Sequence, residues 1–141
     1  VRRFGHLPHR TELVAEKGGV RYIDDSKATN PHATLRALKG LDRVVLVAGG
    51  RAKGLDLSPL AEVAGQVSAV VVMGEAALEL EQVFAGTPSA RAANVEEAVK
   101  LAAGMARPGD TVILSPACSS LDQYSDYAER GNRFRQAVLA L

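Results

Sequence analysis

Three polar segments of this chain contain side chains that could bind a small anionic ligand. Residues 24–30 (DDSKATN) carry two carboxylates, an ammonium group and three further hydrogen-bonding side chains. Residues 49–54 (GGRAKG) combine the cations Arg51 and Lys53 with three glycines, which let a backbone approach a ligand closely. Residues 115–123 (SPACSSLDQ) supply three hydroxyls just before a helical pattern, where hydroxyls and free backbone amides both donate hydrogen bonds. Such donors predict a carboxylate or phosphate ligand.

Each segment also has an interpretation without a ligand. In the first, Asn30 can cap a helix while Asp25 and Ser26 form a turn and Lys27 stays in solvent. The second can be a flexible turn with exposed cations, and it lacks the spacing of both glycine-rich nucleotide motifs, G-x-x-x-x-G-K-[ST] and G-x-G-x-x-G. In the third, Cys118 could be a nucleophile only with a nearby base, and the three histidines all lie in the first quarter of the chain. We interpret it as a packed thiol.

Hydrophobic patterning predicts the elements that position these segments. Extended runs at 11–15 and 20–24 flank Lys17-Gly18-Gly19, which is typical of a tight hairpin. Strands buried on both faces are predicted at 43–48 and 67–73, a brief strand at 90–93 and the last strand at 111–114. Helices are predicted after the cap residues Asn30, Ser58 and Asn94, and at 75–84 and 126–141.

This alternation predicts an α/β fold. We expect a Rossmann-like three-layer sandwich around a mostly parallel six-stranded sheet, with one antiparallel strand from the N-terminal hairpin. Ligands of such sheets bind beyond the carboxyl ends of the strands, where the three polar segments fall. We expect residues 1–10 to lead in from a missing upstream domain and residues 11–141 to form a single domain.

Composition excludes several classes of function. The net charge of +1 leaves no field to attract a polyanion, and three tyrosines and three phenylalanines without tryptophan build no base-stacking platform, so we expect no nucleic-acid partner. The apolar runs are far shorter than the roughly 20 residues of a membrane span. A single cysteine excludes an internal disulfide and fits a reducing compartment. We therefore expect a cytoplasmic protein that binds no membrane and, for lack of ligand spacing, no metal ion within this domain. We also expect it to be a monomer.

Five stretches taken together resemble one family, the Mur ligases. They are residues 7–10 (LPHR), 25–30 (DSKATN), 49–54 (GGRAKG), 114–124 (LSPACSSLDQY) and 129–134 (ERGNRF). The resemblance covers essentially the whole chain and is closest to the C-terminal domain of the members that add D-glutamate. It implies the third domain of a three-domain enzyme, separate from the central ATPase domain. ATP and Mg²⁺ would be bound mainly by that missing domain, so the isolated chain is expected to be inactive.

The same resemblance implies a reaction and residue roles. ATP would phosphorylate UDP-N-acetylmuramoyl-L-alanine on its carboxylate, and the amine of D-glutamate would attack the acyl phosphate. Thr29 and Lys53 would hold the side-chain carboxylate of D-glutamate. The α-carboxylate would be held by Ser120 and the Leu121 amide, in a pocket lined by Tyr127. The residues facing the nucleotide would be Arg10, Asp25 and Lys27, and no catalytic residue is implied in this domain.

Two alternatives stay open on the sequence. The chain could be the corresponding domain of another Mur ligase or of a folylpolyglutamate synthase, although Lys53 with Ser120 and the LSPAC run favours D-glutamate. It could instead be a stand-alone Rossmann-like domain that binds a small molecule. A receiver-like domain of that class would have an acceptor aspartate at the end of a central strand, where this chain has Gly49-Gly50 and Gly74-Glu75.

Overall fold

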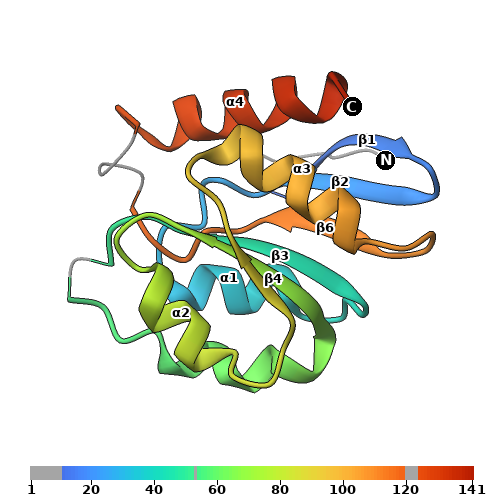
Figure 1. The fold of residues 1–141 in the computed structure, drawn as a ribbon. Coiled ribbons are helices and arrows are strands. Elements are labelled where there is room, and N and C mark those ends of the chain that lie inside the picture. The colour runs from blue at the N-terminus through green and yellow to red at the C-terminus, as the bar shows by residue number, and fades with distance from the viewer. Residues whose placement is uncertain (1–10, 53, 120–123) are drawn as a thin grey trace.

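The computed structural model of the chain describes residues 11–52, 54–119 and 124–141. Within them, one sheet has the strand order β1-β2-β6-β3-β4-β5 (Figure 1). The strands are β1 (Glu12–Lys17), β2 (Val20–Asp24), β3 (Val44–Gly49), β4 (Val67–Met73), β5 (Ser89–Arg91) and β6 (Thr111–Leu114). The helices are α1 (Pro31–Leu38), α2 (Ala77–Val83), α3 (Val95–Met105), α4 (Tyr127–Leu139) and the 3₁₀ helix η1 (Ser58–Gln66). β1 is antiparallel to β2 and the other neighbouring strands are parallel, which confirms the predicted fold.

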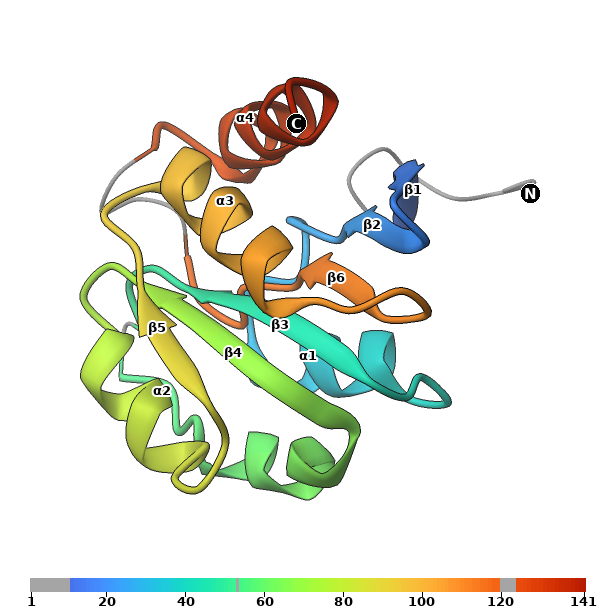
Figure 2. The same cartoon turned by 45° about the vertical axis from the view of Figure 1, so that its right-hand side comes forward.

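Helices cover both faces of this sheet, and each face has its own apolar core (Figure 2). Val45 and Val47 of β3 belong to the core shared with α3 and α4. Leu46, between them in the chain, belongs to the core shared with α1, η1 and α2. Because every residue of β3 is buried, its sequence VVLVAG is apolar throughout instead of alternating. None of the helices in the described ranges combines the length and apolar character needed to cross a membrane.

Side chains near the helix ends start the helices as the sequence predicts. Asn30 Oδ1 accepts a hydrogen bond from the Ala33 amide (3.0 Å), and Pro31 occupies the first position of α1. Asn94 Oδ1 accepts from the Glu97 amide (2.8 Å), while the Glu97 carboxylate accepts from the Ala93 amide (2.6 Å). The bond to Asn30 sets where α1 leaves the polar segment after β2, and the bonds of Asn94 and Glu97 set where α3 begins.

The segment after Ser58 differs from its prediction. We predicted an α-helix capped by Ser58, but residues 58–66 form the 3₁₀ helix η1 and Ser58 is its first residue. The N-cap position is Leu57, which makes no side-chain capping bond, and the Ser58 amide donates instead to Asp56 Oδ1 (3.0 Å). That bond lowers the pKa of Asp56. Val63 and Gly65 also have poor α-helix propensity, which weakens the α-helical alternative here.

Candidate functional site

The three polar segments meet at one edge of the sheet. They follow β2, β3 and β6, which are adjacent and parallel, so their carboxyl ends coincide. Backbone hydrogen bonds join the segments directly. The Asp25 amide donates to Leu114 O (2.8 Å), the Ser115 amide to Val47 O (3.1 Å) and the Ala117 amide to Ala28 O (2.9 Å). The described parts of the predicted site therefore form one connected surface.

An isolated antiparallel bridge joins the segment after β3 to the segment after β6. The Arg51 amide donates to Ser119 O (2.9 Å) and the Ser119 amide donates to Arg51 O (3.0 Å). Ser119 immediately precedes the predicted α-carboxylate donors. Those donors, Ser120 and Leu121, lie outside the described residues, as do Lys53 and Arg10. The bridge thus fixes the backbone leading to both halves of the predicted D-glutamate pocket.

Gly49 and Gly50 allow close contacts between main-chain segments within the described structure. A Cβ at Gly49 would lie 2.0 Å from Met73 O, and one at Gly50 would lie 2.1 Å from Ser119 O. Both residues also have positive φ, +138° and +130°, which L side chains rarely adopt. We predicted that these glycines let the backbone approach a ligand. In the described residues they let β3 and its following segment approach the end of β4 and the segment after β6.

Asp25 is buried and organises the edge of the site. Its Oδ1 accepts from the Thr11 amide (2.9 Å) and its Oδ2 accepts from the Ser115 hydroxyl (3.0 Å). Asp25 also lines a pocket of about 180 Å³ together with Lys27 and the exposed Arg36 of α1. Asp25 therefore joins the segments after β2 and β6 and lies beside a small pocket that Lys27 and Arg36 also line.

Lys27 and Tyr127 come together although 100 residues separate them in sequence. Lys27 Nζ donates to Tyr127 Oη (3.1 Å) and lies 4.7 Å from the centre of the tyrosine ring. Thr29 is half-buried two residues after Lys27, just before the cap of α1. The structure thus joins a residue predicted to face the nucleotide to a residue predicted to line the amino-acid pocket.

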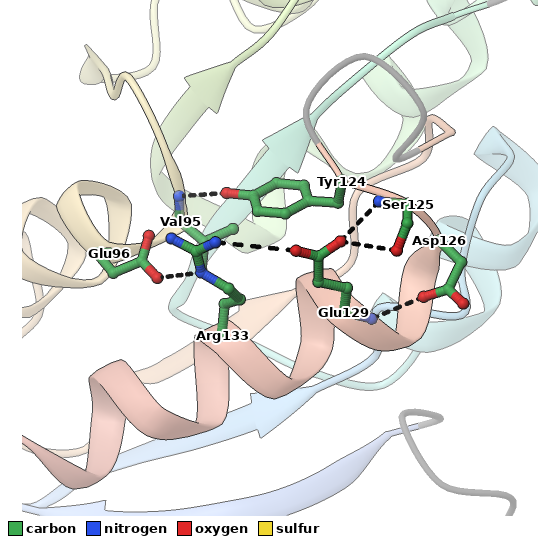
Figure 3. A network of polar contacts seen from close by, with 7 residues as sticks. All are labelled: Val95, Glu96, Tyr124, Ser125, Asp126, Glu129 and Arg133. Carbon is green, nitrogen blue, oxygen red and sulfur yellow. Dashed lines mark hydrogen bonds and ion pairs between the residues drawn. The ribbon is translucent and has the colours of Figure 1, made fainter.

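The first turn of α4, which carries Tyr127, is fixed by a capping box (Figure 3). Asp126 Oδ1 accepts from the Glu129 amide (2.8 Å). Glu129 Oε1 in return accepts from the amide (2.7 Å) and the hydroxyl (2.8 Å) of Ser125. These bonds from Ser125 lower the pKa of the Glu129 carboxyl.

Further contacts hold the start of α4 against the start of α3 (Figure 3). Arg133 of α4 donates through Nε to Glu96 Oε2 (2.6 Å), and its guanidinium lies 5.6 Å from the ring centre of Tyr124. The Tyr124 hydroxyl accepts from the Val95 amide (3.0 Å). Burial raises the pKa of Tyr124. Burial is the largest single influence on Glu96 and opposes its ionisation, but the hydrogen bond from Arg133, a backbone hydrogen bond and the charge of Arg133 together outweigh it, so the pKa of Glu96 falls.

The lowered pKa of Glu129 predicts an acid-sensitive link between the capping box and stability. The ordinary pKa of 4.5 applies to the unfolded chain and the folded value is lower, so the unfolded state binds more protons as the pH falls through 4.5. The stabilisation is therefore complete above that value and is lost below it. We expect urea unfolding to show a steeper loss of stability between pH 5 and pH 3 for the natural chain than for Glu129→Gln. A difference between the two chains that stays constant from pH 7 to pH 3 would contradict this.

Sequence reasoning was wrong about Arg130. The sequence favours a solvated face for the cations early in the terminal helix, Arg130, Arg133 and Arg135, with the crevice at the strand ends as the alternative. Arg133 is exposed as this predicts, whereas Arg135 is half-buried. Arg130 is 1% exposed, and its guanidinium donates to backbone carbonyls. The prediction that Cys118 is a packed thiol is confirmed, since its side chain is buried in the core shared with α1, η1 and α2.

Comparison with known families decides what kind of domain this is. Residues 9–118 match the family model described as "Mur ligase, glutamate ligase domain". The chain belongs to the Mur ligase family. Solved structures agree on the fold of this Mur ligase domain. It superposes on the bifunctional folylpolyglutamate synthase/dihydrofolate synthase of Yersinia pestis with a TM-score of 0.68 and 22% identity, covering 99% of this chain and 32% of that one.

Curated relatives are much closer in sequence. The UDP-N-acetylmuramoylalanine–D-glutamate ligase of Alcanivorax borkumensis is 51% identical over 140 residues, which is 95% of this chain and 32% of that protein. The protein of the same name from Cupriavidus pinatubonensis is 51% identical over 142 residues, 98% of this chain and 28% of that protein. This Mur ligase domain therefore spans about a third of the length of the curated relatives it matches. Within residues 11–52, 54–119 and 124–141 it has no cluster of three or more His, Cys, Asp or Glu side chains suited to a metal ion.

Proposed function

We propose that this chain is the amino-acid-binding domain of an ATP-dependent ligase that joins D-glutamate to UDP-N-acetylmuramoyl-L-alanine. One observation carries the proposal. Curated relatives named for this reaction are about half identical to the chain, and the matches extend over 95% or more of its length. The convergence of three donor-rich segments at the carboxyl edge of the sheet supports it independently. We place this enzyme in the cytoplasm as a monomer.

In this proposal the domain positions its substrate and takes no part in covalent chemistry. A phosphoryl group passes from ATP to the carboxylate of UDP-N-acetylmuramoyl-L-alanine and leaves ADP. The amine of D-glutamate then attacks the acyl carbon, the carbon–nitrogen bond forms, and inorganic phosphate and a proton depart. Holding the nucleophile in line with the acyl carbon replaces a bimolecular encounter, which can lower the barrier by up to roughly 7–11 kcal/mol.

D-glutamate presents two carboxylates, and the proposed site supplies donors for both. Thr29 and Lys53 hold the side-chain carboxylate, and Ser120 with the Leu121 amide holds the α-carboxylate. Support comes from the Arg51–Ser119 bridge, which ties together the two segments that carry Lys53 and Ser120. Tyr127 lines the pocket, and its hydroxyl bonded to Lys27 keeps the ring at the boundary with the nucleotide.

The nucleotide borders the domain at Arg10, Asp25 and Lys27 in this proposal. The pocket lined by Asp25, Lys27 and Arg36 has about 180 Å³, less than the roughly 300–1,000 Å³ of a complete small-molecule site. Its cations and carboxylate suit a phosphate or a ribose edge, so the residues present fit part of a nucleotide. ATP and Mg²⁺ are held mainly by the rest of the enzyme, and the isolated domain is inactive. The Yersinia folylpolyglutamate synthase structure was solved with AMPPNP and a Mn ion.

The second candidate function is the equivalent domain of another Mur ligase or of a folylpolyglutamate synthase. The fold is compatible with it, since the domain superposes on the Yersinia enzyme with a TM-score of 0.68. Its sequence identity is 22%, against 51% for the Alcanivorax D-glutamate ligase. The difference between these identities favours D-glutamate as the amino acid.

Stereoselective substrate use tests the proposed function. We expect the complete enzyme that carries this chain to release ADP with UDP-N-acetylmuramoyl-L-alanine only when D-glutamate is present. L-glutamate should be at least tenfold weaker, because losing one hydrogen bond to a charged group costs about 1.5–3 kcal/mol. Calorimetric titration of D- and L-glutamate in the presence of nucleotide measures the same preference. Equal use of both enantiomers, or turnover with another amino acid only, would contradict the proposal.

A further inference from the structure

Arg130 of α4 is a buried cation that has no role in the proposed binding sites for D-glutamate and the nucleotide. Its guanidinium donates to three main-chain carbonyls: Nη1 to Gly49 O (3.2 Å), Nη2 to Cys118 O (2.9 Å) and Nη2 to Ser26 O (3.4 Å). Gly49 ends β3, Ser26 lies in the segment after β2, and Cys118 lies in the segment after β6. One side chain therefore contacts all three polar segments.

These contacts give the guanidinium a structural reason to be buried. It keeps its charge in a protein, and a buried charge is stable only when hydrogen bonds replace the water it loses. Carbonyl oxygens carry the partial negative charge that this requires. The planar guanidinium directs its N–H groups along fixed directions, so each carbonyl must lie at a defined place. The side chain thus fixes how far apart the three segments are.

The fold is built to place Arg130 there. Arg130, Phe134 and Val138 are spaced four residues apart and form the buried face of α4. Gly50 makes room, since a Cβ at that position would lie 3.0 Å from Arg130 Nη1. The capping box at Ser125 and Glu129 fixes the turn from which Arg130 projects (Figure 3).

We propose that Arg130 is a positioning residue for D-glutamate, holding the three segments at the spacing that the two carboxylates require. The inference rests on the proposed function. Ser26 belongs to the segment of Thr29, Gly49 belongs to the segment of Lys53, and Cys118 belongs to the segment of Ser120. Displacing any of the three carbonyls would move a donor of the proposed pocket. Loss of this preorganisation weakens binding of a ligand held at two points.

The test is the substitution Arg130→Lys in the complete enzyme. Lysine keeps the positive charge but has one nitrogen, which cannot reproduce the fork that reaches three carbonyls. We expect the KM for D-glutamate to rise about tenfold while the KM for ATP and kcat stay within about threefold, measured where each enzyme is at least nine-tenths folded. Hydrogen exchange of the Arg51 and Ser119 amides should accelerate, while the amides of β3 and β4 stay protected. The matched control is Arg133→Lys, on the next turn of α4, which should leave the KM for D-glutamate unchanged.

Each outcome of this experiment has a distinct meaning. A lower kcat with an unchanged KM for D-glutamate would show a purely structural role and overturn the proposal, because a smaller folded fraction leaves KM unaltered. If Arg130→Lys is not folded, Arg130→Gln takes its place, and failure of both to fold would likewise overturn it. If the natural enzyme does not use D-glutamate, the proposed function has failed. The exchange of the Arg51 and Ser119 amides then still decides whether Arg130 fixes the segments.

Discussion

Gly50→Ala should lower the free energy of unfolding of the 141-residue chain by about 4 kcal/mol or more. The new Cβ would lie 2.1 Å from Ser119 O and 3.1 Å from its carbonyl carbon. Main-chain atoms cannot rotate out of the way, so the segment after β6 must move or the Arg51–Ser119 bridge must break. The positive φ of +130° adds backbone strain, which costs roughly 1–3 kcal/mol. For a chain of this size the loss corresponds to a fall of roughly 15 °C in Tm.

Gly54→Ala is the matched control for this substitution. Gly54 lies in the same segment and also has a positive φ, +75°, but a Cβ there would meet no atom within 4 Å. Only the conformational cost remains, about 1–2 kcal/mol. Urea unfolding of both variants at pH 7 measures the difference. Equal losses would mean that the clash with Ser119 relaxes without cost and that the close approach at Gly50 is unimportant.

The fold could be predicted because the physics that decides it is local in sequence. The apolar run VVLVAG predicts a strand covered on both faces, and β3 is such a strand. Asn30 and Asn94 predict helix starts, and both side chains accept the capping hydrogen bond. The helix type of η1 could not be predicted, since the Ser58-Pro59 pattern does not distinguish an α-helix from a 3₁₀ helix. The Ser58 amide donates to Asp56, two residues earlier, and no side chain caps η1 at Leu57.

The candidate site could be predicted in its location but not in its internal contacts. Because parallel strands end at the same edge of a sheet, the sequence predicts that the three segments lie together. The described residues confirm that they do. The contact between Lys27 and Tyr127 depends on how α4 packs, which no local pattern encodes. The burial of Arg130 could have been predicted from its spacing. It lies four residues before Phe134 and eight before Val138, which places all three on the buried face of α4. The D-glutamate roles of Lys53, Ser120 and Leu121 stay predictions.

Lys53→Ala should raise the KM for D-glutamate by roughly 10- to 100-fold in the complete enzyme, given the proposed function. The ammonium group is expected to donate to the side-chain carboxylate, and a hydrogen bond to a charged group contributes about 1.5–3 kcal/mol. Saturating D-glutamate should restore most of kcat, because the remaining donors still orient the amine. The KM for ATP should stay within about twofold. Initial rates of ADP release over a D-glutamate series measure all three quantities.

Arg51→Ala separates a specific contact from a general effect of charge. Arg51 is two residues from Lys53 and carries the same charge, but its guanidinium donates to Glu75 Oε2 through Nε and Nη2, both at 3.1 Å. Its bridge to Ser119 uses main-chain atoms, which the substitution leaves in place. The KM for D-glutamate should therefore change less than about twofold. If Arg51→Ala raised the KM for D-glutamate as much as Lys53→Ala, the segment would attract its substrate through net charge alone.

An unchanged KM for D-glutamate in Lys53→Ala would remove Lys53 from the site. Recognition of the side-chain carboxylate would then shift to Thr29 and its neighbours.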